Sequence, residues 1–143
     1  MRRALVLVIS LVVFAVVNHV ADAARTDGLW PVKKTVTITN RLPSKALLRV
    51  HCRSKNDDLG IRYLRYDESF HFKFRTDIFF RTLFYCSFEW PGSGRKHWYD
   101  IYNDWLDHCK HCKFVVKNYG VCKYNNRTYL YDKCFSWQNE IRH

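Results

Sequence analysis

Apolar and polar residues alternate along several short segments of this chain. Threonine alternates with aliphatic residues over Thr35–Thr39. Over Leu48–Arg53 the apolar residues alternate with basic ones, and over Phe70–Arg75 phenylalanines do the same. Successive side chains of a strand face opposite sides, so each segment predicts a strand with one buried face. We predict further strands at residues 82–90, 96–102, 113–116 and 128–131.

Polar connectors separate these segments at short and regular intervals. They cover residues 55–60, 67–69, 91–95 and 103–110. Short strands with turn residues at this spacing are typical of an all-β sandwich or barrel. The alternation alone does not choose between these two architectures.

The first two dozen residues follow a different pattern. Arg2 and Arg3 precede an uncharged stretch over Ala4–Val17. Further on, the small residues Ala21 and Ala23 flank Asp22. A basic start, an apolar centre and a small-x-small site are typical of a secretory signal peptide. The apolar run is shorter than the roughly 20 residues that a membrane span needs. We therefore expect residues 1–23 to be a cleaved signal peptide, residues 24–34 to be a flexible lead-in, and the protein to be secreted without a membrane span.

Six cysteines lie beyond this segment, at positions 52, 86, 109, 112, 122 and 134. An even number in a short secreted chain predicts a disulfide framework, and six cysteines allow 15 complete pairings. His108, Cys109, His111 and Cys112 are the one zinc candidate. A structural zinc site usually takes a second ligand pair from a distant segment, which this chain lacks. We expect Cys52, Cys86, Cys109, Cys112, Cys122 and Cys134 to form disulfides in an undetermined pairing, with no metal and no other cofactor.

Charge narrows the class of partner only slightly. The chain has 24 Lys and Arg against 13 Asp and Glu, and removal of residues 1–23 leaves 22 against 12, a net charge of +10. Such a surface attracts acidic partners at long range. Because most aromatic residues are assigned to the core, we expect no nucleic-acid partner.

Two further patterns bear on chemistry. Asn126, Arg127 and Thr128 form an N-glycosylation acceptor in a polar segment. No Ser/His/Asp or Cys/His arrangement emerges from the spacing, and the cysteines are expected to be oxidised. We therefore expect no enzymatic activity.

The ordered motifs of the chain resemble one known family, the plant self-incompatibility protein S1 family, also called S-protein homologues. The resemblance covers residues 35–137 and departs at Phe114, where relatives often have tryptophan. The motifs that carry it are VTITN at 36–40, VHCRSKNDDLG at 50–60, FHFKF at 70–74, TLFYCSFEW at 82–90, HWYDIY at 97–102 and YDKCFSW at 131–137.

This resemblance implies a small disulfide-stabilised antiparallel β-sandwich of immunoglobulin-like architecture over residues 35–138. It also implies an extracellular, non-catalytic ligand of a cell-surface receptor protein, which we expect to be a monomer. The alternative is a basic defence protein that acts on anionic membranes or acidic cell-wall polysaccharides.

Recognition by such a rigid scaffold is expected in its loops and exposed faces. Two sets of residues are candidates for it. The loop candidates are Asn56, Asp57, Asp58, Arg95, Lys96, Asp104 and Asp107. The basic-face candidates are Arg49, Arg53, Lys73 and Arg75.

Overall fold

A computed structural model describes residues 2–23 and 31–139. The chain divides into two units, residues 1–30 and residues 31–143. In the first unit the structure describes residues 2–23, which form the helix α1 (Arg2–Ala23). Over the parts of the chain that the structure describes, no helix combines the length and apolar character that a membrane span requires. Helix α1 covers the predicted signal peptide, whose cleavage stays a prediction.

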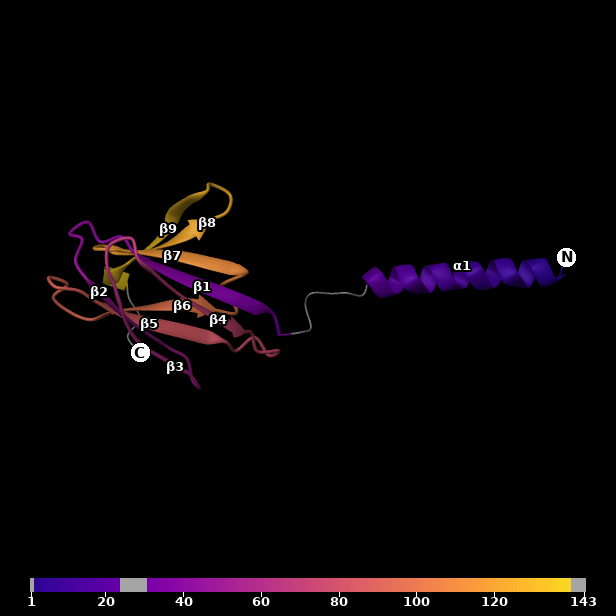
Figure 1. The fold of residues 1–143 in the computed structure, drawn as a ribbon, viewed down its shortest axis with the longest axis horizontal. Helices are drawn as coiled ribbons and strands as arrows, with labels where there is room; N and C mark the ends of the chain where they lie inside the picture. Colours follow the sequence, from indigo (N-terminus) through magenta and orange to yellow (C-terminus); the bar gives the residue numbers. More distant parts are fainter. Residues whose placement is uncertain (1, 24–30, 140–143) are drawn as a thin grey trace. The chain divides into compact units, whose positions relative to one another are not determined.

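The second unit is a sandwich of two β-sheets (Figure 1). One sheet has five strands in the order β4-β1-β7-β8-β9, and the other has four in the order β3-β2-β5-β6. The strands are β1 (Lys33–Asn40), β2 (Leu48–Arg53), β3 (Asp58–Leu64), β4 (Ser69–Arg75), β5 (Leu83–Glu89), β6 (His97–Asn103), β7 (His111–Lys117), β8 (Gly120–Asn125) and β9 (Leu130–Ser136). A short 3-10 helix, η1 (Trp137–Asn139), follows β9.

The core lies between the two sheets and follows the predicted alternation. Leu48, Val50 and Cys52 of β2 are fully buried, whereas the basic residues between them are more exposed. In β4, Phe72 is buried against Phe84 of β5, with ring centroids 5.1 Å apart. Large aromatic side chains bury much area in a small core. The predicted all-β, disulfide-stabilised sandwich is therefore confirmed.

One pairing departs from a purely antiparallel sandwich. β1 runs antiparallel to β4 but parallel to β7, with Thr35 opposite His111. A parallel pair needs a long crossover. Here the whole of the other sheet and β4 lie between β1 and β7 in sequence. The alternation of apolar and polar residues within one strand does not indicate whether that strand pairs parallel or antiparallel with its neighbour.

The predictions missed two strands and misplaced a third. Residues 55–60 were expected to be a connector, but β3 begins at Asp58 and pairs with β2. β3 is an edge strand with most side chains exposed, so no alternation marks it. β8 was missed because its first three residues, Gly120–Cys122, are all buried. The last strand was expected at residues 128–131 but covers Leu130–Ser136.

The predicted flexible lead-in is only partly described. Residues 24–30 lie outside the described residues. Lys33 and Lys34 already belong to β1, where they pair with Arg75 and Phe74 of β4. The sheet therefore begins before the predicted boundary at residue 35.

Candidate recognition surface

The strand directions place the loops at two opposite ends of the sandwich. β5 runs from the loop of residues 76–82 to the loop of residues 90–96. The first of these shares its end with the loop of residues 104–110, because the Asp104 amide donates to the Thr82 carbonyl and the Thr82 amide donates to the Asp104 carboxylate. We call this the β4–β5 end and the opposite one the β5–β6 end. Most of the predicted recognition residues lie at one or the other of these ends.

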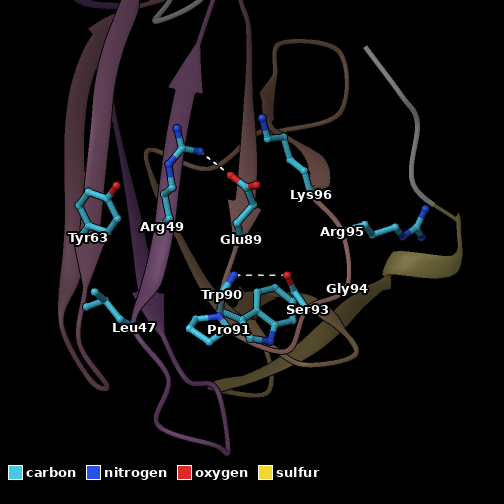
Figure 2. Close-up of a pocket in the computed structure, with 10 residues that line it drawn as sticks. All are labelled: Leu47, Arg49, Tyr63, Glu89, Trp90, Pro91, Ser93, Gly94, Arg95 and Lys96. Carbon is cyan, nitrogen blue, oxygen red and sulfur yellow. Dashed lines mark hydrogen bonds and ion pairs between the residues drawn. The ribbon is translucent and has the colours of Figure 1, made fainter.

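Three predicted residues meet near the β5–β6 end, around a pocket of about 700 Å³ (Figure 2). Arg49 comes from β2, and Arg95 and Lys96 come from the loop between β5 and β6. We call this cavity the Trp90 pocket. Its other lining residues are Leu47, Tyr63, Glu89, Trp90, Pro91, Ser93 and Gly94.

The polar groups of the Trp90 pocket are held in place by their neighbours. Arg49 Nη1 donates to Glu89 Oε2 at 2.5 Å, so this pair carries no net charge. Arg95 Nη2 donates to the carbonyl oxygen of Trp137 at 3.1 Å. The Lys96 ammonium lies 5.8 Å from the ring centroid of Trp98. Besides the Arg49–Glu89 pair, two cationic side chains, Arg95 and Lys96, line the pocket.

The aromatic wall of the pocket is also rigid. The rings of Trp90, His97 and Trp137 stack in one cluster, with centroid distances of 5.1 Å from His97 to Trp90, 4.8 Å from His97 to Trp137 and 6.3 Å between the two indoles. Trp137 Nε1 donates to the Lys117 carbonyl at 3.2 Å, which ties this stack to β7. In Figure 2, Tyr63 and Leu47 lie on one side of the Arg49–Glu89 pair, and Arg95 and Lys96 lie on the other. The pocket therefore offers a fixed indole, an exposed phenol and two cations.

A second group of predicted residues meets at the β4–β5 end. Asn56, Asp57, Lys73 and Arg75 line a groove of about 900 Å³ that Lys55 and Arg81 also line. Within the described residues, no carboxylate lies within ion-pair distance of Lys55, Lys73 or Arg75. The groove is therefore predominantly basic. Only one half of the predicted basic face, Lys73 and Arg75, contributes to it.

Asp58 and Arg53 lie elsewhere, on the outer face of the β2–β3 pair. Asp58 accepts hydrogen bonds from His51 Nε2 at 2.6 Å and from the Gly60 amide at 2.9 Å, and it pairs with Arg53 at 3.2 Å. The hydrogen bond from His51, followed by that from Gly60, lowers the pKa of the Asp58 carboxyl below its usual value. These groups bind one another and fix the start of β3.

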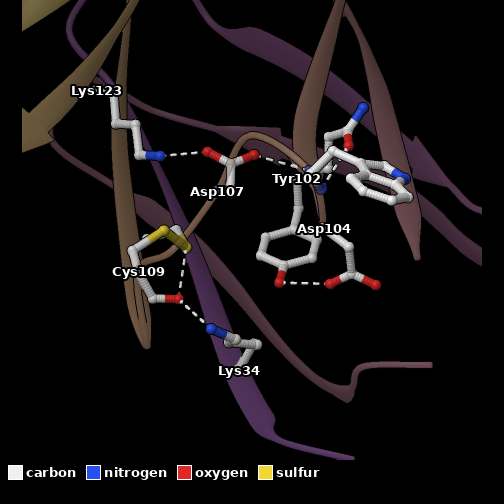
Figure 3. Close-up of polar contacts among 9 residues, drawn as sticks. Lys34, Tyr102, Asp104, Asp107, Cys109 and Lys123 are labelled. Carbon is white, nitrogen blue, oxygen red and sulfur yellow. Dashed lines mark hydrogen bonds and ion pairs between the residues drawn. A yellow bond between two sulfur atoms is a disulfide. The ribbon is translucent and has the colours of Figure 1, made fainter. Parts of the chain in front are cut away.

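Asp104 and Asp107 hold the loop that follows β6 (Figure 3). Asp104 accepts hydrogen bonds from the Tyr102 hydroxyl at 2.8 Å and from the Thr82 amide at 2.8 Å. Asp107 accepts from the Asn103 amide at 2.7 Å and pairs with Lys123. Burial, and then the Asp104 carboxylate, raise the pKa of the Tyr102 phenol. Both carboxylates are occupied within the fold.

Trp105 and Leu106 lie between these two aspartates and are the most exposed large apolar residues of that loop. Our sequence analysis did not single them out. The available signal was their position, because two large apolar residues interrupt the predicted polar connector of residues 103–110.

The six cysteines form three disulfides. The pairs are Cys52–Cys86, Cys109–Cys112 and Cys122–Cys134. The two candidate zinc thiolates are thus bonded to each other. Among residues 2–23 and 31–139, no group of three or more potential metal-ligating side chains occurs. Asn126 is exposed in the turn between β8 and β9, and its glycosylation stays a prediction.

Comparison with known proteins gives consistent matches. The family model described as "Plant self-incompatibility protein S1" matches residues 35–137. S-protein homolog 3 of Arabidopsis thaliana is 34% identical over 140 residues, covering 92% of each chain. S-protein homolog 2 of the same plant is 38% identical over 128 residues, covering 84% of this chain and 78% of its own length.

A solved structure supports the fold. It is described as "Structure of SPH (Self-Incompatibility Protein Homologue) proteins, a widespread family of small, highly stable, secreted proteins from plants". The TM-score is 0.52 at 23% identity, with 65% of this chain and 84% of that chain covered.

Proposed function

The chain belongs to the plant self-incompatibility protein S1 family, and from this premise we propose that it is a secreted, non-catalytic recognition ligand that binds a cell-surface protein. Three disulfides and a rigid sandwich suit a protein that works outside the cell. The signal peptide predicted at residues 1–23 supports the same extracellular location.

The Trp90 pocket is the observation that carries the proposal. Tyrosine, tryptophan and arginine are the residues enriched at the energetic centres of protein interfaces. Here Tyr63, Trp90 and Arg95 line one cavity. Since the stack with His97 and Trp137 already fixes Trp90, little side-chain entropy is lost when a partner binds there.

Charge suggests the chemistry of the partner segment. Beyond the neutral Arg49–Glu89 pair, the pocket presents Arg95 and Lys96. An acidic segment that also carries an apolar or aromatic side chain matches such a cavity, because it meets cations and rings together. The partner we propose is therefore an exposed acidic loop of a cell-surface protein.

Saturable binding to plant cells tests this proposal. The labelled secreted protein is titrated onto intact protoplasts, alongside Tyr63→Ala and Lys96→Glu, whose parent side chains are both exposed. We expect Tyr63→Ala to weaken binding about tenfold or more, as loss of a central interface tyrosine does. The matched controls are Leu130→Ala and Lys133→Glu on β9 of the other sheet, and both should bind like the parent protein.

Salt separates this function from the alternative. Raising ionic strength from about 0.15 M to about 1 M shortens the Debye length from about 8 Å to about 3 Å. Binding through the Trp90 pocket should be only partly weakened by this change, because its aromatic contacts do not depend on charge. Binding that is unsaturable, vanishes in high salt and is equal for Tyr63→Ala would contradict the proposal, and it would favour a defence protein that acts through charge alone.

A further inference from the structure

Large apolar side chains protrude into solvent from two loops at the β4–β5 end. Phe79, Trp105 and Leu106 are 64%, 73% and 75% exposed. Phe80 joins the two loops, because its ring centroid lies 6.3 Å from that of Trp105. We define the apolar tip as Ile78, Phe79, Phe80, Trp105 and Leu106. Apolar side chains gathered on an exposed surface mark an interaction site more often than single ones do.

Hydrogen bonds hold these residues outward. Asp104 Oδ2 accepts from the Thr82 amide at 2.8 Å, and the Thr82 carbonyl accepts from the Asp104 amide at 3.1 Å, so the two loops are joined. Asp77 Oδ1 accepts from the Phe79 amide at 2.6 Å. Phe80 has a φ of +55°, a conformation that is costly for a bulky residue. The loops are therefore built to expose the tip.

The charge around the apolar tip is positive. Of the three carboxylates in its two loops, Asp77 pairs with Arg81 and Asp107 with Lys123, whereas Asp104 is hydrogen-bonded by the Tyr102 hydroxyl and keeps its negative charge. The adjoining groove, which shares Asp77 and Arg81 with the first loop, adds cations that have no ion pair among the described residues. These cations are Lys55, Lys73 and Arg75, and they outnumber the carboxylates of Asp57 in the groove and Asp104 in the loop.

We propose that the apolar tip and these cations form a docking surface for a lipid bilayer that contains anionic phospholipids. Aromatic residues favour the membrane–water interface, and a basic rim adds attraction to acidic headgroups. None of the five tip residues lines either cavity described above. Protruding apolar side chains can insert among lipid acyl chains, whereas a folded protein partner would need pockets of complementary shape. A bilayer therefore fits the apolar tip better than a folded protein does.

This inference does not depend on the proposed receptor function. β5 separates the apolar tip from the Trp90 pocket, and a strand of its length spans about 20 Å. A molecule docked by its tip therefore leaves the Trp90 pocket accessible. An experiment that refutes one of the two proposed surfaces therefore does not refute the other.

Cosedimentation with vesicles tests the docking surface. The secreted protein is mixed with phosphatidylcholine vesicles that contain phosphatidylserine, and with pure phosphatidylcholine vesicles. We expect partition into the acidic vesicles, and at least about tenfold weaker partition for the double variant Phe79→Ser/Trp105→Ser. The matched control is Tyr129→Ser/Leu130→Ser, which removes comparably exposed apolar side chains outside the tip and should partition like the parent.

Tryptophan fluorescence gives a second, positional readout. Brominated lipids should quench the emission of the vesicle-bound protein, and Trp105→Phe should lose most of this quenching yet still sediment, since phenylalanine keeps the apolar contact. Three results would overturn the inference. They are no sedimentation with acidic vesicles, equal sedimentation of the tip variant, or a tip variant that loses binding to cells when the parent protein binds no vesicles. The last result would assign the tip to a protein contact.

Discussion

At the scale of single residues, Asn40 connects three separate backbone segments. It is fully buried at the end of β1, and its Nδ2 donates to the Ala46 carbonyl at 2.9 Å and to the Leu64 carbonyl at 2.8 Å. Its Oδ1 accepts from the Leu42 amide at 3.0 Å. The sequence does not reveal these contacts, because the partners lie just before β2 and at the end of β3 and meet Asn40 only in the folded domain.

We predict that Asn40→Ala lowers the free energy of unfolding by about 3 kcal/mol, since it leaves buried backbone groups unsatisfied. Urea unfolding measures this change. The exposed Asn56 provides the control, and Asn56→Ala should cost less than about 0.5 kcal/mol. Equal stabilities for the two variants would refute the role assigned to Asn40.

Tyr99 makes the free energy of unfolding depend on pH in the alkaline range. Its ring packs against Phe135, with centroids 5.1 Å apart, and burial raises the pKa of its phenol to about 12, helped by the carboxylates of Asp107 and Asp100. A pKa that is higher in the folded state than in the unfolded state contributes stability at pH values below the unfolded pKa. That contribution is lost as the pH rises from about 10 toward 12.

We therefore predict that the free energy of unfolding falls over this alkaline range and that Tyr99→Phe falls less steeply. Chemical unfolding at a series of pH values, together with phenolate absorbance of the folded protein, measures both. A Tyr99 phenolate that forms near pH 10 in the folded state would show this reasoning to be wrong.

At the scale of elements, sequence patterns found the strands with one buried face and missed those without. β1, β2 and β4 alternate clearly between core and solvent. β3 has exposed residues on both faces, and β8 begins with buried residues on both, so neither carries a period of two. The parallel direction of β1 and β7 arises from packing across the whole domain.

The three disulfides differ in the length of chain that they close. The sequence separations are 34 for Cys52–Cys86, 12 for Cys122–Cys134 and 3 for Cys109–Cys112. Because a disulfide mainly constrains the unfolded chain, double alanine variants of these pairs should cost about 4, 3 and 2 kcal/mol in that order. Denaturant unfolding of the three variants measures the ranking, and a reversed ranking would contradict the argument.

At the scale of the whole molecule, the sandwich presents two different surfaces at its ends. The sequence identified Arg49, Arg95 and Lys96 individually, but it did not bring them together. Their convergence with Tyr63 requires β3 to lie beside β2, and β3 was the edge strand that the pattern missed. The other predicted residues were separated or occupied by the fold, as Asp104 and Asp107 illustrate.

Photocrosslinking from the Trp90 pocket on intact plant cells tests the central claim most directly. A photoreactive phenylalanine replaces Tyr63 in one protein and Leu130 in another, both exposed in the parent. We predict that the Tyr63 position yields one discrete, protease-sensitive adduct, that excess unlabelled parent protein suppresses it, and that the Leu130 position yields none. Identical products from both positions, or adducts with lipid or polysaccharide alone, would contradict recognition of a cell-surface protein through this pocket.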